Sequence, residues 1–505
     1  MLKDILKGAG TDAAKYFPVR LVPALTSLVT VPVFTRLIGR ADYGDFYLVS
    51  SATTFAATFA TAWITGSAVR FYWPYEKQGR EDDYVATTLW SSIASLAVVS
   101  ALLGAGALVF AGDIPPSVAR LIPVGIAGLA FNYLFNVLLQ VLRASNRSTA
   151  FATLSVAGTV VATAFSVSFV AGPRWGSYGI LLGVLLGHAV LIPFCLREVR
   201  KEGKLSPRHV RRDVFDEFLR YGIPMVPAAV SAWMLVMSDR YVIGFLRGTA
   251  EVGMYSVAYG LGEKVMQLVM MPAVITMAPV MVQTFEKRGQ HVAQRVQTQF
   301  TRYFSMATFP LLFGLAGAAR DFMGIFTGEA YRAAYPILPI VAAGVMCYGL
   351  VQIAGNGIAL HKRSTIIMSN TLAAAAFNLG ANLVLVPVFG YMAAAYTTLA
   401  SYVALLALTW VRSRPYMSWD IPWLDLGRIT AAGLAMWGAI AVTAALLPAN
   451  IAVLALEAVV GIAAYVAALL GLRALRDDER EFVAELAGKA ASRLGFRRAT
   501  EGAGP

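Results

Sequence analysis

Fourteen apolar runs follow one another along the chain, and each is long enough to cross a lipid bilayer as a helix. About 18 or more apolar residues predict a membrane span, because the hydrocarbon core is about 30 Å thick and a helix satisfies its own backbone hydrogen bonds there. The runs lie near residues 16–36, 46–68, 85–110, 120–142, 149–171, 177–196, 221–239, 253–284, 303–319, 335–360, 366–387, 392–410, 429–446 and 451–471. We therefore predict an all-α polytopic membrane protein with fourteen transmembrane helices.

The sequence between the first two runs returns in the middle of the chain. "RLIGRADYGDFY" at residues 36–47 aligns with "FLRGTAEVGMYS" at residues 245–256 after a shift of 209 positions. A second alignment, at a shift of 216, matches "RST" at 147–149 to "RST" at 363–365. Spans 1 to 6 therefore recur as spans 7 to 12. An even number of crossings per half predicts a parallel repeat about an axis along the membrane normal, with spans 13 and 14 as additions.

The repeated motif has the residues of a turn between two spans. Gly39 and Gly44 let a chain reverse tightly, and Asp42 can cap the positive N-terminus of the next helix. The second copy keeps both glycines and has Glu251 where the first has Asp42. We predict an outer turn in each half, with the contacts to any cargo deeper in the spans.

The runs and the repeat divide the chain into five parts. They are an N-terminal six-helix bundle (1–196), a cytoplasmic amphipathic linker (197–220), a C-terminal six-helix bundle (221–410), the additional helices 13 and 14 (411–471) and a basic cytoplasmic tail (472–505). In the linker, Ser206 is a good N-cap before Pro207, and an apolar stripe predicts a helix on the inner membrane surface. That stripe comprises Val210, Val214, Phe215 and Phe218. A similar stripe in the tail predicts contact with anionic lipid, or else a solvated helix; it comprises Phe482, Val483, Leu486, Ala490 and Leu494.

The net charge of +13, with 42 Lys and Arg residues, raises the question of a nucleic-acid partner. About three quarters of these cations lie in segments that face the cytoplasm if the N-terminus does, and about a fifth lie in the opposite loops. This bias predicts that both termini are cytoplasmic, and it explains most of the positive charge without nucleic acid. Since only 14% of the residues are charged and 58% are hydrophobic, the composition is that of a membrane protein.

The residue patterns do not indicate an enzyme, a cofactor or a metal. Cys195 and Cys347 lie in different predicted spans and make neither a disulfide framework nor a metal site. "GLGEKV" at residues 260–265 lacks the spacing of an ATP-binding glycine loop and lies inside a span. The longest loop between spans is the basic linker, so we expect no soluble catalytic domain.

Three stretches resemble the polysaccharide-export flippases: "VPVFTRLIGRADYGDFYLVSS", "MSDRYVIGFLRGTAEVGMYSVAYGLGEK" and "FNLGANLVLVPVFGYMAAAYTTLAS". The resemblance covers residues 10–415, and its superfamily also contains multidrug and toxin extrusion antiporters and peptidoglycan lipid flippases. It implies two pseudo-symmetric six-helix bundles in a V around a central cavity, alternating between inward-open and outward-open states. It also implies the cargo, an oligosaccharide on undecaprenyl diphosphate, carried to the outer leaflet of a bacterial inner membrane alongside polysaccharide assembly proteins.

Such a cargo would need a wet groove, because burying one sugar hydroxyl without a partner costs roughly 4–8 kcal/mol on an alkane scale. Small polar residues at helical spacing inside apolar spans predict a groove of this kind. They are Asn132, Asn136 and Gln140 in span 4, Gln352 and Asn356 in span 10, and Asn370, Asn378 and Asn382 in span 11. The alternative for each of them is an interhelical hydrogen bond that holds the bundle together.

Ionisable residues inside spans are rarer, and they usually face a cavity or a partner. We predict that Arg20 in span 1 and Lys264 in span 8 hold the anionic diphosphate, although Lys264 could instead pair with a nearby carboxylate. Asp239 and Arg240, toward the outer end of span 7, would form a gating pair or a second cationic station. Three further cations at inner span ends either receive the diphosphate or anchor the spans; they are Arg70, Arg220 and Arg302.

The energy source and the rival functions stay open at this stage. A proton or sodium gradient, or the membrane potential at about 2.3 kcal/mol per charge per 100 mV, would reset the carrier. Glu457 in span 14 and His188 in span 6 either carry a coupling proton or pack against a polar neighbour. A lipid II flippase and a cation-coupled multidrug antiporter are rivals in the same superfamily. A polytopic polymerase or glycosyltransferase would be expected to have a large outer loop or an Asp-x-Asp motif.

Overall fold

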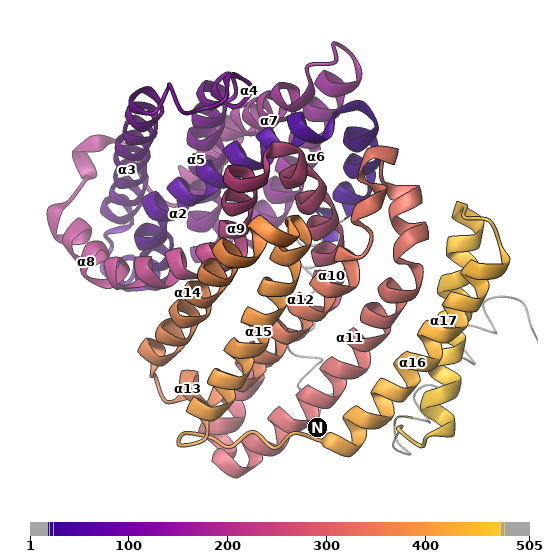
Figure 1. Cartoon of the computed structure of the whole chain (residues 1–505). Coiled ribbons are helices and arrows are strands. Elements are labelled where there is room, and N and C mark those ends of the chain that lie inside the picture. Colours follow the sequence, from indigo (N-terminus) through magenta and orange to yellow (C-terminus); the bar gives the residue numbers. More distant parts are fainter. Residues whose placement is uncertain (1–18, 20, 24, 476–478, 480–505) are drawn as a thin grey trace, which may run out of the picture.

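The computed structural model describes residues 19, 21–23, 25–475 and 479, and all the regular elements in these residues are helices. Figure 1 shows two lobes, with α2 to α7 in one and α10 to α15 in the other, and with α16 and α17 at the outer edge beside α11. Arg20 and the apolar stripe predicted at 482–494 lie outside the described residues.

The first lobe begins with a helix that ends at Leu37. Its other helices are α2 (Arg40–Glu76), α3 (Glu81–Val109), the short α4 (Pro116–Ala119), α5 (Ile122–Ala144), α6 (Ser148–Ala171) and α7 (Gly176–Val199). A linker follows, with the 3-10 turn η1 (Pro207–His209), α8 (Arg212–Gly222) and the 3-10 turn η2 (Ile223–Met225).

The second lobe has the same number of long helices, and a hairpin follows it. The helices are α9 (Val226–Arg247), α10 (Thr249–Arg288), α11 (Gln290–Phe326), the 3-10 turn η3 (Glu329–Ala334), α12 (Ile337–Ala354), α13 (Asn356–Leu360), α14 (Ser364–Phe389) and α15 (Tyr391–Ser413). The hairpin consists of α16 (Trp423–Leu446) and α17 (Ile451–Gly471).

Among the described residues, twelve helices are long and apolar enough to cross a membrane, which confirms an all-helical polytopic membrane protein. The two remaining predicted spans correspond to the first helix, which reaches Leu37, and to α2. α2 has 37 residues, but Ser and Thr recur along it and lower its hydropathy. These hydroxyls bond back to the carbonyls of their own helix, as Thr58 does to Thr54 (2.8 Å), so they suit a helix inside a bilayer.

The duplication seen in the sequence is also present in the helix contacts. α5 contacts α2 and α7 in the first lobe, and α12 contacts α10 and α15 in the second. Likewise α6 contacts α7, and α14 contacts α15. The hairpin of α16 and α17 has no counterpart in the first lobe and lies on α11.

The linker forms an amphipathic helix, but that helix begins at Arg212 and not at Pro207 as predicted, because Ser206 caps only the short turn η1. Val210 of the predicted stripe lies outside the helix and is exposed. The apolar side of α8 faces the protein. Val214 and Phe218 of α8 are fully buried. The ring of Phe218 lies 5.9 Å from that of Phe71 on α2 and 6.0 Å from that of Tyr84 on α3. Helix α8 therefore braces the ends of α2 and α3, because these aromatic side chains offer it an apolar surface that lipid would otherwise supply.

Candidate functional site

The two lobes meet where the repeated motif brings α2 and α10 together. Gly44 of α2 lies so close to α10 that a methyl group there would come within 2.7 Å of the Thr249 carbonyl carbon. A methyl group on Gly253 of α10 would come within 3.1 Å of the Arg40 carbonyl carbon, so the relation is reciprocal. Glycine allows two helix backbones to approach this closely. The equivalent glycines of the two repeats thus form the crossing point of the lobes.

Hydrogen bonds between distant segments join the lobes at the same end. The Gly328 amide donates to the Thr35 hydroxyl (2.9 Å), and the Tyr331 hydroxyl donates to the Ile38 carbonyl (3.0 Å). Each bond links the end of the first helix to the segment that follows α11. We call the end of the molecule that holds these bonds and the glycine crossing the closed end.

The turn predicted from the motif is shorter than expected. The break before α2 covers Ile38 and Gly39, and the break before α10 is Gly248, whose φ of 90° favours glycine. The prediction that Gly44 helps the chain to reverse is wrong, because Gly44 lies inside α2. Its lack of a side chain serves the approach of α10.

The acidic residue of each motif caps a helix, but not the helix that follows it. Asp42 accepts hydrogen bonds from the amide (3.1 Å) and hydroxyl groups of Ser177, at the start of α7. Glu251 accepts one from the Tyr391 amide (3.0 Å), at the start of α15. Because α7 and α15 are the sixth spans of their halves, each acid ties the second span of a half to its sixth.

Removal of the first cap should lower stability by a measurable amount. We expect Asp42→Ala to cost about 0.5–2 kcal/mol, because the amide groups at the start of α7 lose their acceptor. Thermal melting of the purified protein measures this loss. Asp42→Asn keeps a side-chain acceptor and should melt closer to the wild type; equal melting temperatures for all three proteins would contradict the cap.

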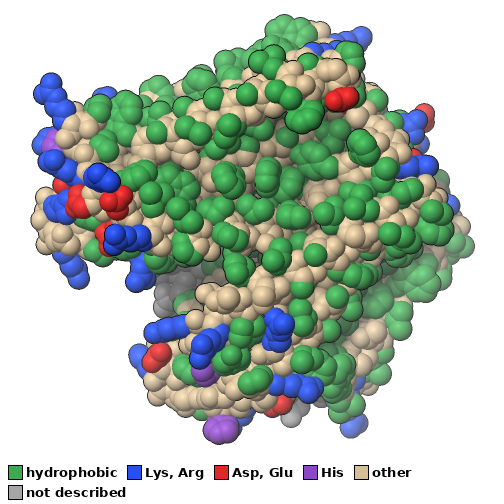
Figure 2. Space-filling model, turned by 60° about the vertical axis from the view of Figure 1, so that its left-hand side comes forward, with side chains coloured by type: hydrophobic (Ala, Val, Ile, Leu, Met, Phe, Trp, Pro, Cys, Tyr) green, Lys and Arg blue, Asp and Glu red, His purple; other side chains and the backbone are tan. Residues whose placement is uncertain are grey.

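The opposite end of the molecule is open between the lobes. Figure 2 shows a hollow between them at the end where α8 and α13 lie, and Lys and Arg side chains gather on both lobes beside it. Hydrophobic side chains are spread over much of the remaining surface in this view, as expected for a lipid-facing protein. The molecule is thus closed by the glycine crossing at one end and hollowed at the other.

A buried group of charges lies in the second lobe, between α9 and α10. Asp239 and Arg240 are 1% and 3% exposed, and the Arg240 guanidinium donates to the Asp239 carboxylate (3.1 Å). The Tyr255 hydroxyl donates to the same carboxylate, and the guanidinium lies over the ring of Tyr259 at 4.9 Å. The two predicted residues therefore form a real pair, and burial keeps that pair from solvent in this state.

The two tyrosines of this cluster are functional candidates that sequence reasoning missed. Tyr255 and Tyr259 are four residues apart, so they lie on one face of α10. This spacing was visible in the sequence, but nothing local linked it to a charge pair on the preceding helix. The tertiary contact supplies that link.

Lys264 lies half-buried on α10, beyond the tyrosines. Its neighbour Glu263 accepts a hydrogen bond from Gln267 (2.9 Å). Lys264 itself forms no ion pair with any residue that the structure describes. The local pairing considered from the sequence is therefore not observed, and the ammonium group is available to an anion.

The polar residues of span 4 meet a histidine of span 6. The Asn132 amide lies 3.5 Å from His188 Nδ1, and Asn136 donates to the Asn132 side chain (3.0 Å). His188 thus packs against a polar neighbour, which was one of its two predicted roles. Asn136 is exposed and Gln140 is half-buried, so polar groups on this helix reach the surface.

Span 10 shows the same arrangement in the second lobe. Gln352 is exposed, and Asn356 donates to the Gln352 carbonyl (3.1 Å). In the first lobe, Asn136 donates to the Asn132 carbonyl in the same way (2.8 Å). The equivalent helices α5 and α12 therefore each present an exposed amide within an apolar span.

The asparagines of span 11 behave differently, since they bridge two helices. Asn378 and Asn382 are fully buried, and Asn382 donates to Asn378 (3.1 Å). Asn378 also donates to Thr398 of α15 (3.3 Å), and Asn382 accepts from Thr397 (2.5 Å). These contacts favour the interhelical alternative over a cargo groove.

The three predicted cations at inner span ends have different surroundings. Arg70 is exposed and lies over the Tyr221 ring at 5.1 Å, next to the exposed Arg220. Arg302 is 2% exposed and pairs with Asp425 (3.1 Å). It also pairs with Glu479, so its charge is already balanced. Arg70 and Arg220 can meet an incoming anion, whereas Arg302 fastens α11 to α16.

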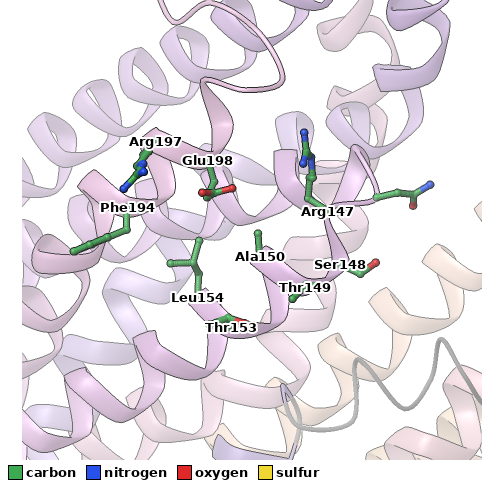
Figure 3. Close-up of a pocket in the computed structure, with 10 residues that line it drawn as sticks. Arg147, Ser148, Thr149, Ala150, Thr153, Leu154, Phe194, Arg197 and Glu198 are labelled. Carbon is green, nitrogen blue, oxygen red and sulfur yellow. The ribbon is translucent and has the colours of Figure 1, made fainter.

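A pocket of about 650 Å³ opens between the ends of α6 and α7. Figure 3 shows Arg147, Arg197 and Glu198 on one side of it, with Thr153 and Leu154 opposite. All ten lining residues belong to the first lobe. The pocket therefore lies within one lobe and not between the two, and we assign it no part in a path across the membrane.

No cluster of three or more metal-binding side chains occurs in the described part of the chain.

The family model for "Polysaccharide biosynthesis protein" matches residues 12–285. A curated protein, the probable low-salt glycan biosynthesis flippase Agl15 of Haloferax volcanii, is 21% identical over 259 residues. This match covers 51% of the present chain and 54% of that protein, so the chain spans about half the length of this relative.

Solved structures of similar fold cover most of the chain. The lipid II flippase MurJ in an inward closed conformation has a TM-score of 0.71 at 15% identity, covering 92% of this chain and 99% of that one. An inward-facing multidrug resistance MATE family transporter of the MOP superfamily has a TM-score of 0.59 at 14% identity, covering 79% and 94%. At these identities the likeness establishes the fold.

Proposed function

The chain belongs to the polysaccharide biosynthesis protein family, and from that premise we propose that it carries a lipid-linked oligosaccharide across a membrane by alternating access. The cargo we propose is an oligosaccharide repeat unit on undecaprenyl diphosphate. It would enter at the hollow and leave after the closed end has opened. We place it in a bacterial inner membrane, and the distribution of Lys and Arg favours an orientation with both termini in the cytoplasm.

One observation carries this proposal: the two lobes are joined at one end and separated at the other. The glycine crossing of Gly44 and Gly253 holds the closed end, and Figure 2 shows the hollow at the opposite end. Two pseudo-symmetric lobes can exchange these roles by rocking relative to each other, so that the crossing separates as the opposite end closes, and such an exchange is alternating access. In a water-filled hollow the sugar hydroxyls keep their hydrogen bonds, so the free-energy cost of burying them is avoided while the lipid tail stays in the bilayer.

We propose Lys264 as a cation that holds the diphosphate, together with Arg20. Lys264 is half-buried in an apolar helix and has no ion pair among the described residues. An unpaired ammonium group in a membrane span is unfavourable in free energy unless it binds an anion. Arg70 and Arg220, exposed at the open end, would meet the anion first. The amides of Asn136 and Gln352, exposed in equivalent helices, would bond sugar hydroxyls.

Transport in proteoliposomes tests this assignment. We expect Lys264→Ala to lower the rate of oligosaccharide-lipid flipping about fivefold, because a charged hydrogen bond from a half-buried group is lost. Lys287→Ala removes an exposed cation from the end of the same helix and should leave the rate unchanged. The charge site is rejected if a double variant, Lys264→Ala with Arg20→Ala, flips the lipid at the wild-type rate.

The same vesicles separate the rival functions within this fold. Lipid II and an organic cation are offered in place of the oligosaccharide lipid. Faster movement of lipid II would identify a peptidoglycan-precursor flippase, and efflux of the cation would identify a multidrug antiporter. We expect the oligosaccharide lipid to be moved fastest, because the family match concerns polysaccharide biosynthesis.

A further inference from the structure

Two carboxyl groups face each other inside the membrane region, where the hairpin lies on the second lobe. Gly317 of α11 and Gly461 of α17 both lie against Ile440 of α16. One helical turn further toward the closed end, α11 carries Asp321 and α17 carries Glu457. The two side chains therefore come from different helices to one level of the junction, where α11 and α17 are in direct contact.

Both carboxyl groups are removed from solvent, and three of their four oxygens find no donor in the described part of the chain. Glu457 is 0% exposed and Asp321 is 8% exposed. Among the residues that the structure describes, neither oxygen of Glu457 finds a hydrogen-bond donor, and Oδ2 of Asp321 finds none either. Ionised carboxylates only accept hydrogen bonds, so two of them cannot satisfy each other.

The surrounding helices supply no counter-charge in the described structure. Asp321, on the helix opposite Glu457, carries a charge of the same sign when both are ionised. Arg320, the next residue on α11, is exposed, and its guanidinium lies over the Tyr335 ring at 5.6 Å. Several ionisable groups on the elements that pack against α11 and α17 bond to other partners. They are Glu329 with Arg332 on η3 (3.5 Å), Asp425 of α16 with Arg302 (3.1 Å), Glu263 of α10 with Gln267 (2.9 Å), Glu251 of α10 with Arg247 (3.0 Å), and Tyr465 of α17 with the Met306 carbonyl (2.9 Å). Lys264 of α10 has no ion pair in the described residues, and no contact between it and either carboxyl group is observed. Arg428 of α16 lies at the opposite end of its helix and reaches the Arg473 carbonyl (3.3 Å).

We propose that Asp321 and Glu457 form a proton-binding site, in which one carboxyl group holds a proton and donates it to the other. Two like charges in a medium of low polarity repel strongly, and each also loses its hydration. A single shared proton removes one charge and supplies the missing donor. The proton belongs to the pair and not to either residue alone. It fastens the hairpin to α11, and its loss at high pH loosens that contact.

This site is independent of the cargo, so its test does not require transport. The melting temperature of the full-length protein in nanodiscs is measured between about pH 5 and about pH 9. We expect the wild type to lose stability as the pH rises, because the folded protein holds a proton that the unfolded chain releases. In Glu457→Gln, the amide donates to Asp321 at every pH, so the fall in melting temperature should shrink by at least about 2 °C.

Controls keep the result specific to the pair. Glu329→Gln removes an exposed carboxyl group and should keep the wild-type pH dependence. Asp321→Asn tests the reciprocal variant if Glu457→Gln does not fold. Infrared difference spectra between the two pH limits should show the carbonyl stretch of a protonated carboxylic acid in the wild type, and Glu457→Gln should lose it. The proposal is overturned if Glu457→Gln and Asp321→Asn both keep the wild-type pH dependence of the melting temperature. It is also overturned if Glu457→Gln shows the same carbonyl band as the wild type.

Discussion

Gly44→Ala is expected to lower the transport rate at least about tenfold, because it adds a methyl group at the crossing point of the two lobes. The group that the methyl would meet is the backbone of Thr249 on α10, which cannot move aside as a flexible side chain can. Overpacking typically costs about 1–3 kcal/mol, and each 1.4 kcal/mol shifts a conformational equilibrium about tenfold. The state with the closed end shut should therefore become rare.

Both the rate and the state can be followed in one preparation. Flipping is measured in proteoliposomes, and the opening of the closed end is measured by thiol labelling of a cysteine introduced beside Tyr331. Gly39→Ala is the matched control, because a methyl group at Gly39 meets nothing within 4 Å. The reciprocal change, Gly253→Ala, should behave like Gly44→Ala. Normal transport in both crossing variants would show that the glycines do not set the closed state.

Asp239→Asn should destabilise the protein by about 3–5 kcal/mol, the largest loss of stability that we expect from a single substitution here. The change removes the negative charge and leaves the Arg240 guanidinium buried at 3% exposure without an ionic partner. It also weakens the hydrogen bond that the Tyr255 hydroxyl donates to this carboxylate. Thermal melting in detergent measures the effect.

A second substitution separates stability from transport. The double variant Asp239→Asn with Arg240→Met should recover much of the lost stability, because no unpaired charge stays buried. If its transport stays low while its melting temperature recovers, Arg240 also contacts the cargo. Arg332→Met breaks an exposed pair and should cost less than about 1 kcal/mol. An unchanged melting temperature for Asp239→Asn would show that the pair does not stabilise the second lobe.

Several local features of the fold were predictable because they depend on short stretches of sequence. The amphipathic helix of the linker follows from its apolar stripe, although the structure begins it at Arg212 and not at Pro207. The break at Gly248 follows from glycine, which tolerates the positive φ found there. The partner of that helix was not predictable. Phe218 of α8 meets Phe71, far away in the chain, and the same stripe would equally suit a lipid surface.

The candidate site was predictable only as single residues. The pairing of Asp239 with Arg240 follows from their adjacency, but the tyrosines that complete the cluster come from α10. Arg302 illustrates the opposite case. Its position at a span end suggested a free cation, yet the structure fastens it to Asp425 of the hairpin. No sequence pattern relates these two positions.

The sequence by itself determined that this protein is helical, polytopic and duplicated. Hydropathy decides the first two properties locally, because each apolar run must satisfy its own backbone in lipid, and the two motif copies reveal the third. The tertiary structure alone decided that Gly44 and Gly253 meet, that Asp42 caps α7, and that Asp321 faces Glu457. These contacts join segments far apart in the chain. They arise when whole helices settle against one another, and single-sequence patterns do not record that step.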